Sequence, residues 1–439
     1  MIRFVVALFT ALVMSFPAAA AVDIKEVKSP GGLTAWLVED HSIPFAALEI
    51  RFRGGASLDA PGKRGAIALM SYLLDEGAGD LDARAFARAS ESLATSFGFD
   101  ISDDELSVSA RFLTENREAS LELLRSALLE PRFDADAIER VRAQVLSGIR
   151  SDAKDPNAIA GRTMDGIIWG DHPYATALEG TEESVAALTR EDLVAAHRAI
   201  FARDRIYIGA VGDITEEELS SLMDALLGDL PEAGAPMPPR AEIDIPGGTT
   251  VVPFETPQSV AIFGQAGIKQ DDPDYFTAAV LNRILGGGSF ESRLMNEVRE
   301  KRGLTYGVYS YLAPKDLGEV YMGSVSSAND RIAEAIDVIR SEWQRAADEG
   351  VTPEELANAK TYMTGAYPLR FDGNARIARI IVGMQMLGLP IDYIATRNER
   401  VEAVTLEDVR RVAAELLDPE GLHFVVVGQP EGVETTAAN

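Results

Sequence analysis

The sequence predicts an α+β protein made of two copies of one domain of roughly 200 residues. The first observation is a repeat: three separate stretches recur at a constant offset of 216 residues. The matching pairs are residues 31–32 with 247–248, 188–193 with 404–409, and 210–212 with 426–428. The second observation is the order of elements, because strands are grouped with pairs of helices between them instead of alternating one by one. Three stretches that keep one offset indicate a duplicated domain.

Each half is expected to begin with strands, continue with helices and close with a strand. The strands are predicted at residues 46–53 and 205–211 in the first half, and at 249–253, 259–264 and 422–427 in the second. Amphipathic helices are predicted at residues 121–129, 136–149, 331–348 and 352–364. Residues 229–248 contain five prolines and read as an extended, semi-stiff linker, so the domains are placed at 22–228 and 249–439.

Residues 1–21 read as a cleaved signal peptide, which places the mature chain in the bacterial periplasm. Arg3 provides the positive start, residues 4–14 the apolar stretch, and residues 17–21 the small residues of a cleavage zone. The chain has no cysteine, so an exported protein of this size is expected to depend on its hydrophobic core alone.

Charge and hydropathy exclude two classes of partner. The formal net charge is -28, whereas binding to nucleic acid needs a basic face. After the first residues, no apolar stretch is long enough to predict a stable membrane span.

Residues 285–309, LGGGSFESRLMNEVREKRGLTYGVY, hold the candidate site. A helix that carries Arg293 is expected to end near Lys301, so that Arg299 and Tyr306 can converge at its C-terminal end. A guanidinium and a phenol are both donors suited to a peptide carbonyl or its oxyanion. Before the helix lie Gly286, Gly287, Gly288, Ser289 and Phe290. No Gly-Lys-Ser/Thr follows, so this is not a phosphate loop; it is either a flexible connection or a surface that meets extended peptide.

Several motifs in order resemble the pitrilysin/insulinase family of zinc peptidases. They are residues 65–77, His172-Pro173-Tyr174 with Gly180-Thr181-Glu182, and residues 189–193, 286–290 and 298–304. The resemblance implies two domains, each an antiparallel-rich sheet with helices packed on one side, arranged as a half-clamshell.

The family's zinc motif, H-x-x-E-H on a helix, is degenerate in this chain. The resemblance aligns the two His positions with Ala68 and Tyr72 and the Glu position with Ser71. The later Glu ligand would fall near Gly148, within residues 145–150, which hold no carboxylate. Asp75 and Glu76 are expected to end the helix before Gly77, in solvent. The chain's histidines, His41, His172, His197 and His423, include no two at ligand spacing, so we expect no metal in this chain.

The resemblance implies a role for the second half. In family members whose work is divided between two chains, the partner of the zinc subunit contributes an Arg/Tyr pair across the interface, which here corresponds to Arg299 and Tyr306. Residues 286–290 resemble the glycine-rich loop of the non-zinc processing-peptidase subunit, which meets peptide substrate. The expected activity is therefore proteolysis by a heterodimer, with zinc in a homologous partner.

Two other functions stay open at this point. A non-catalytic scaffold or peptide-binding protein of the same fold would resemble the core subunits of respiratory complexes, and would have no need of the Arg299/Tyr306 spacing. An independently active peptidase would need a site that the sequence does not reveal.

Overall fold

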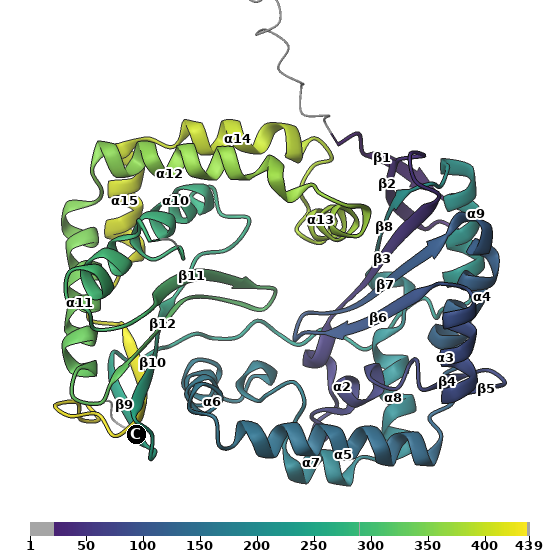
Figure 1. Ribbon diagram of the computed structural model, residues 1–439, viewed down its shortest axis with the longest axis horizontal. Helices are drawn as coiled ribbons and strands as arrows, with labels where there is room; N and C mark the ends of the chain where they lie inside the picture. Colours follow the sequence, from purple (N-terminus) through teal and green to yellow (C-terminus); the bar gives the residue numbers. More distant parts are fainter. Residues whose placement is uncertain (1–21, 289, 437–439) are drawn as a thin grey trace, which may run out of the picture.

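Two halves of matching topology face each other in the computed structural model, which describes residues 22–288 and 290–436 (Figure 1). The predicted signal peptide lies outside the described residues. The first half holds a six-stranded sheet in the order β1-β2-β8-β3-β7-β6 and the second a five-stranded sheet in the order β11-β12-β10-β13-β9. All neighbours pair antiparallel except β2 with β8 and β13 with β9. The predicted α+β class with antiparallel-rich sheets is confirmed.

The strands of the first sheet are β1 (Lys25–Lys28), β2 (Thr34–Glu39), β3 (Phe45–Arg53), β6 (Ser96–Ile101), β7 (Glu105–Leu113) and β8 (Ile206–Gly212). Those of the second are β9 (Gly248–Pro253), β10 (Gln258–Ala266), β11 (Val308–Lys315), β12 (Gly318–Ala328) and β13 (His423–Gly428). A small hairpin is formed by β4 (Gly77–Ala78) and β5 (Leu81–Asp82). Apart from β1, the strand order of the first sheet recurs in the second, as the sequence repeat predicts.

The first half contains α2 (Ala66–Ser71), α3 (Ala83–Ser92), α4 (Arg117–Leu129), α5 (Ala135–Asp152), α6 (Pro156–Trp169), α7 (Glu182–Ala187), α8 (Arg190–Ile200) and α9 (Glu216–Leu227). The second contains α10 (Tyr275–Leu285), the π-helix η5 (Met295–Glu300), α11 (Ile332–Glu349), α12 (Pro353–Ala366), α13 (Asn374–Met386), α14 (Tyr393–Ala403) and α15 (Leu406–Leu416). Short 3₁₀ turns are η1 (Gly55–Leu58), η2 (Thr114–Asn116), η3 (Pro173–Ala175), η4 (Arg203–Arg205) and η6 (Pro368–Arg370).

The repeat includes the helix starts. Thr189 and Thr405, 216 residues apart, each accept a hydrogen bond from the backbone of a residue three positions later, and the Asp at that position bonds back to the threonine N–H. This reciprocal capping satisfies donors that a helix leaves unpaired at its first turn. It explains why the same T-x-x-D pattern recurs in both halves.

Each half covers the inner face of the other half's sheet with one helix. Helix α6 packs on β10 and β13 through Met164, Ile168 and Trp169. Helix α13 packs on β3 and β8 through Ala378 and Ile381. Shifted by 216 residues, the bounds of α6 fall within two residues of those of α13, so the exchanged helices are equivalent elements of the repeat. The predicted packing of helices on one side of each sheet therefore holds for the helices of the same half. The other face of each sheet is covered by one helix from the opposite half.

Polar contacts join the tips of two hairpins, one from each half. Lys315 Nζ lies 2.6 Å from Asp103 Oδ2, and the backbone N–H of Asp316 donates to Asp104 Oδ2 at 3.2 Å. The hydroxyl of Tyr174 donates to Asp104 and accepts from the backbone N–H of Leu317. These bonds fix the distance between the halves beside the exchanged helices. The predicted linker runs past this junction without regular structure until β9 begins, and its exact limits as a domain boundary stay a prediction.

Candidate functional site

The helix that would carry the zinc motif is short and lies inside the first core. Helix α2 ends at Ser71, and a series of turns follows it up to Glu76. Ala68 and Ser71 have no exposed surface, and the Ser71 hydroxyl donates to the Ala68 carbonyl at 2.8 Å. The expectation that Asp75 and Glu76 end this helix is wrong, because the helix stops one turn earlier and both residues lie in turns. Glu76 is not free in solvent either, since Arg140 on α5 lies 2.5 Å from its carboxylate.

Apart from the buried Ala68, the positions that correspond to zinc ligands and to the catalytic Glu nevertheless line one cavity. Ser71, Tyr72 and Gly148, which are far apart in the sequence, all line a hollow of about 490 Å³ between α2 and α5. Its other polar walls are Gln144 and four acidic residues, Asp75, Glu76, Asp152 and Glu179. Alignment with the family motif therefore selects residues that lie at one site in space, although their side chains are not those of a zinc site.

The residues of this cavity do not fit a zinc site. Burial, together with the nearby carboxylates of Glu179 and Asp100, raises the pKa of the Tyr72 phenol above its ordinary value, so it stays protonated and is a poor ligand at neutral pH. No imidazole lies among the lining residues, and zinc sites in proteins favour imidazole and thiolate ligands. Within residues 22–288 and 290–436, no group of three or more His, Cys, Asp or Glu side chains is arranged to hold a metal ion.

The four histidines lie in separate places, and each has a partner of another kind. The ring nitrogens lie within hydrogen-bond distance of Asp213 for His41 (2.7 Å), the Pro239 carbonyl for His172 (3.1 Å), the Leu128 carbonyl for His197 (2.8 Å) and the Pro246 carbonyl for His423 (2.6 Å). Three of the four therefore bond to backbone, which is a structural role.

In the second half, the predicted helix before Lys301 forms, but as a π-helix, η5. Arg299 lies in its last turn, and the guanidinium carbon is 4.7 Å from the centre of the Phe290 ring. Its nearest carboxylate is that of the adjacent Glu300, at 3.5 Å. A cation over an aromatic face is held weakly and keeps its donors free. The structure thus brings together Arg299 and the end of the glycine-rich loop, two features that the sequence predicted separately.

A buried ion pair anchors the start of η5. Arg293 is 9 % exposed and donates two hydrogen bonds to the Glu355 carboxylate, from Nε to Oε1 at 2.6 Å and from Nη2 to Oε2 at 2.7 Å. It also donates to the Gly350 carbonyl at 3.0 Å. This bidentate ion pair holds the start of η5 in one orientation against α12, and therefore also positions Arg299. No motif in the sequence marks Arg293 for this role.

Tyr306 stands in solvent on a short bend between η5 and β11. It is 89 % exposed, which is unusual for an aromatic side chain. The bend is held by Thr305, whose hydroxyl accepts from the Gly307 N–H at 3.1 Å and donates to the Ser326 carbonyl at 2.7 Å. Tyr306 makes no hydrogen bond to another described residue, and the aromatic ring that Arg299 stacks on is that of Phe290.

The glycine-rich loop changes character along its length. Gly286 is buried, and a Cβ there would lie 2.2 Å from Ser310 Oγ; a Cβ at Gly287 would lie 2.7 Å from the Arg283 Cα. These two glycines are therefore required by packing. Gly288 has φ of +73° with open space around it, and Phe290 is 68 % exposed. Ser289 lies outside the described residues. Of the described residues of this loop, Gly288 and Phe290 are the ones exposed enough to meet a ligand.

The sequence reasoning missed two tyrosines beside this loop. Tyr309 and Tyr311 lie on β11, the edge strand of the second sheet, 48 % and 45 % exposed, with their rings stacked at 6.2 Å. They alternate with buried Val308 and Ser310, so their side chains share one face of the sheet. The Y-x-Y alternation in a predicted strand was the signal that would have found them.

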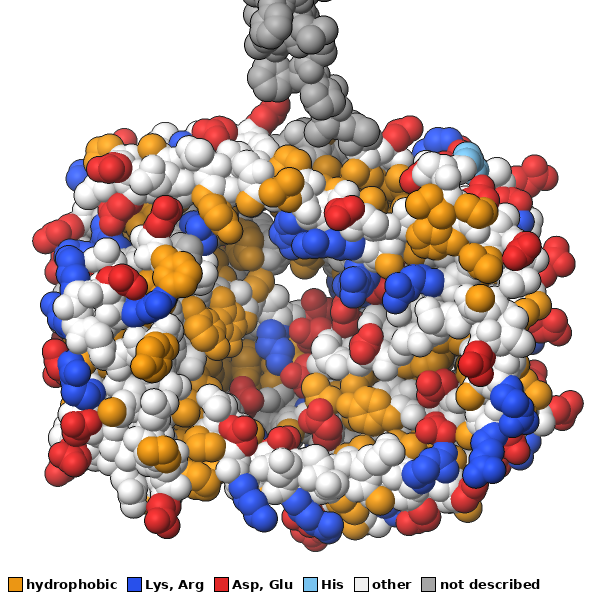
Figure 2. Space-filling model, viewed as in Figure 1, with side chains coloured by type: hydrophobic (Ala, Val, Ile, Leu, Met, Phe, Trp, Pro, Cys, Tyr) orange, Lys and Arg blue, Asp and Glu red, His pale blue; other side chains and the backbone are white. Residues whose placement is uncertain are grey.

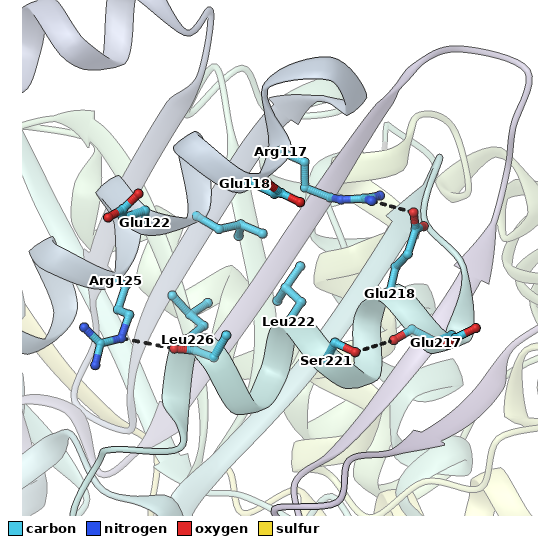
Figure 3. Close-up of a pocket in the computed structure, with 11 residues that line it drawn as sticks. Arg117, Glu118, Glu122, Arg125, Glu217, Glu218, Ser221, Leu222 and Leu226 are labelled. Atoms are coloured by element: carbon cyan, nitrogen blue, oxygen red, sulfur yellow. Dashed lines mark hydrogen bonds and ion pairs between the residues drawn. The ribbon is translucent and has the colours of Figure 1, made fainter.

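Another hollow, of about 570 Å³, lies on the outside of the first half between α4 and α9 (Figure 3). Figure 3 shows Arg117 directed toward Glu218, and the two charges lie 2.5 Å apart. Arg125 donates to the Ala225 carbonyl at 3.1 Å. One ion pair therefore crosses the groove, and the other acidic residues that line it, Glu118, Glu122 and Glu217, form no cluster with a histidine or a second cation among the described residues.

Comparisons with known proteins agree with this geometry. A family profile described as "Peptidase M16 inactive domain" matches residues 187–363, a stretch that contains Arg299 and Tyr306. A Helicobacter pylori protein named "Non-peptidase homolog YmxG" is 26% identical over 97% of this chain and 98% of its own length. An uncharacterized zinc protease of Streptomyces coelicolor is 24% identical, covering 90% of this chain and 87% of that protein.

Among solved structures, a peptidase M16 inactive domain from Pseudomonas fluorescens superposes with a TM-score of 0.85 at 28% identity, covering 95% of this chain and 100% of the other. A Helicobacter pylori protease superposes at 0.83 with 16% identity over 92% and 99% of the two chains, which shows the fold alone. The predicted resemblance to the pitrilysin/insulinase peptidases is confirmed, and an inactive, non-peptidase type fits these matches. None of the helices among the described residues is both long and apolar enough to cross a bilayer.

Proposed function

This chain is related to the M16 peptidases, and on that premise we propose that it is the zinc-free subunit of a heterodimeric zinc endopeptidase. It would close a chamber over a homologous partner that carries H-x-x-E-H, and it would contribute Arg299 and Tyr306 to peptide bound at the partner's metal.

One contrast between the two halves carries the proposal. The cavity that corresponds to a zinc site is lined by Ser71, Tyr72 and Gly148, none of which can replace a His or Glu ligand. Arg299 and Tyr306 keep donors that no carboxylate of another element occupies, and Tyr306 stands 89 % exposed. A protein that needed these two residues only for its own stability would bury or pair them.

The chemistry of the two donors fits peptide cleavage in a partner's site. Arg299 would hold a substrate carbonyl near the scissile bond with its planar fork of N–H groups. Tyr306 would donate its hydroxyl to the carbonyl oxygen, and more strongly to the oxyanion that forms from it. The partner's zinc would activate the attacking water. Phe290, which stacks on Arg299, and Gly288 would meet the substrate backbone.

We also propose that the chain acts in the periplasm. The support is the order of a positive residue, an apolar stretch and small residues within residues 1–21. A signal-sequence deletion that leaves the protein in the cytoplasm would support this location, and unchanged export would contradict it.

A scaffold function is the second candidate. The observation in its favour is that packing alone accounts for Gly286 and Gly287, so the first half of the loop needs no substrate to explain it. A scaffold would bind the same partner without contributing to the reaction.

Reconstitution tests the proposal. The chain is purified alone and together with a homologous H-x-x-E-H protein from the same organism, and the zinc content and hydrolysis of a peptide library are measured for each. The proposal predicts that the chain alone is zinc-free and inert, and that the pair forms a stable 1:1 complex and cleaves peptide. One equivalent of zinc with hydrolysis by the chain alone would overturn it and favour an independent peptidase. A complex that forms but leaves the partner's own rate unchanged would favour the scaffold.

A further inference from the structure

A pocket of about 560 Å³ lies between the exchanged helix α13 and helices α10 and α14. Its walls include four arginines, Arg370, Arg376, Arg379 and Arg397, and no aspartate or glutamate. The whole chain has 69 acidic residues and 41 basic ones, so a wall with four positive charges and no negative one departs from the composition of the rest.

None of the four guanidinium groups forms an ion pair with a described carboxylate, whereas Arg51, Arg53 and Arg293 each pair with one. The charge of Arg379 acts at longer range on Glu49 of β3, where it opposes the rise in pKa that burial causes. Arg397 instead donates to the Met363 carbonyl at 2.8 Å and lies 4.5 Å from the centre of the Tyr367 ring. Burial, with a further contribution from Arg370, lowers the pKa of Arg397. Positive charges that face each other without an anion are an unfavourable arrangement that a bound anion would relieve.

The remaining walls are aromatic. Tyr275 and Phe276 come from α10, Tyr367 and Phe371 from the chain on either side of η6, and Tyr393 from α14. Burial raises the pKa of Tyr367 to about 12, so this phenol is neutral and cannot balance the arginines. A site with apolar rings and a few charged groups selects ligands that combine both properties.

The helix exchange creates this pocket. One face of α13 packs on the first sheet through Ala378 and Ile381, and the other presents Arg376, Arg379 and Gly383, which are spaced three and four residues apart. A Cβ at Gly383 would lie 3.6 Å from Arg51 Nη1 on β3, so at this residue α13 also lies close to the first sheet. Figure 2 shows that basic side chains gather at the edge of the central hollow between the halves, in the region of α13.

We propose that this pocket binds an acidic peptide segment in which carboxylates flank an aromatic residue. Two or more carboxylates would each take a guanidinium fork, and the aromatic residue would pack on the tyrosine and phenylalanine walls. Inorganic phosphate offers the same anionic oxygens without the aromatic group, so it is the ligand to be distinguished. The inference takes from the proposed function only that the ligand is a peptide.

Binding is measured by calorimetry on the full mature chain alone, at low ionic strength. The probes are the peptide acetyl-Glu-Phe-Glu-amide, its counterpart acetyl-Gln-Phe-Gln-amide, and sodium phosphate. The variant is Arg376→Gln with Arg379→Gln; both residues are exposed and make no side-chain hydrogen bond that the structure records, so the fold is expected to persist. The control, Arg84→Gln with Arg88→Gln on α3, makes the same change in net charge away from the pocket.

We expect the glutamate peptide to bind at least about tenfold more tightly than the glutamine peptide, because each charged fork is among the stronger hydrogen-bonded contacts. The pocket variant should lose about tenfold in affinity and the control should lose less than about twofold. Equal binding of the two peptides, unchanged binding by the pocket variant, or phosphate binding as tightly as the glutamate peptide would each overturn the inference. Since no partner is present, a failure here leaves the divided active site untouched, and a failure of reconstitution leaves this test intact.

Discussion

Replacing Arg293 by methionine tests how the structure holds Arg299 in place. Methionine keeps most of the length and apolar volume of the side chain but removes both bonds to Glu355 and the bond to the Gly350 carbonyl. Removing one partner of a buried ion pair costs about 3–5 kcal/mol, because the other charge stays buried without compensation.

The pKa of Glu355 gives an independent magnitude. Burial raises this pKa, but the hydrogen bonds from Arg293 and from the Thr352 backbone outweigh burial and hold it at about 2, against an ordinary value of 4.5. At about 1.4 kcal/mol per pH unit, that difference corresponds to about 3 kcal/mol. The Glu355 side chain is 29% exposed and Thr352 supplies part of the effect, so we expect Arg293→Met to lower the free energy of unfolding by about 2–3 kcal/mol at pH 7.

The pH dependence has a definite sign. Because the folded-state pKa of Glu355 lies below its unfolded value, its contribution is present in full above pH 4.5 and is lost as the pH falls through about 2. The difference in stability between wild type and Arg293→Met should therefore shrink between pH 5 and pH 2.

Urea unfolding followed by tryptophan fluorescence measures both effects, since Trp343 is fully buried in the core of the second half. The control is Arg331→Met, which removes an exposed pair with Glu334 at 3.5 Å and an exposed bond to the Arg302 carbonyl at 3.2 Å, and should change stability by less than about 1 kcal/mol. If Arg293→Met costs no more than this control, or if its cost is the same at pH 3 and pH 7, the reasoning on the anchor is refuted.

Four further substitutions test other parts of the structure, each by unfolding in urea. Burial raises the pKa of Asp165 to about 6, with Lys315 opposing the rise, so stability should fall as the pH rises from about 4 to 6. Asp165→Asn should flatten this pH dependence and raise the free energy of unfolding by about 1–2 kcal/mol at pH 7. A loss of stability at pH 7 would contradict this account of Asp165. Gly286→Ala should lower the free energy of unfolding by more than about 2 kcal/mol, because its Cβ would lie 2.2 Å from Ser310 Oγ. Gly288→Ala, at φ of +73° in open space, should lower it by about 1 kcal/mol. Equal losses would contradict the packing role of Gly286. A Cβ at Gly209 would lie 2.6 Å from Val382 Cγ2, so Gly209→Ala should weaken the seat of α13 on the first sheet by about 1–3 kcal/mol, and a neutral result would show that this contact yields easily.

The repeat made much of the fold predictable. Residues 188–193 and 404–409 begin helices with the same cap in both halves, and the predicted strand at 46–53 differs from β3 by a single residue at its start. The exchange of α6 and α13 could not be predicted, because their apolar faces show that each helix is buried but not which sheet buries it. The same limit hid the pocket on α13, whose arginines come from four places between Arg370 and Arg397 and converge only when the helix crosses to the other half.

At the candidate site, sequence identified residue types but not their surroundings. Alignment with the zinc motif selected Ala68, Ser71, Tyr72 and a position near Gly148, and the structure places the last three at one cavity while Ala68 is buried in the core. In contrast, the ring of Phe290 under Arg299 and the grip of Arg293 on Glu355 depend on tertiary contacts between residues whose spacing in the sequence is irregular. The participation of Arg299 and Tyr306 in catalysis stays a prediction.

The most direct measurement of that prediction is kcat/KM for peptide hydrolysis by the reconstituted pair, with Tyr306→Phe in this chain. Tyr309→Phe is the matched control, because it removes one exposed hydroxyl and keeps the ring on the same surface. If Tyr306 donates to the oxyanion, Tyr306→Phe should lower kcat/KM about a hundredfold, mainly through kcat, while Tyr309→Phe changes it less than about threefold. A pair that assembles with normal zinc content and cleaves equally well with Tyr306→Phe would contradict the divided active site.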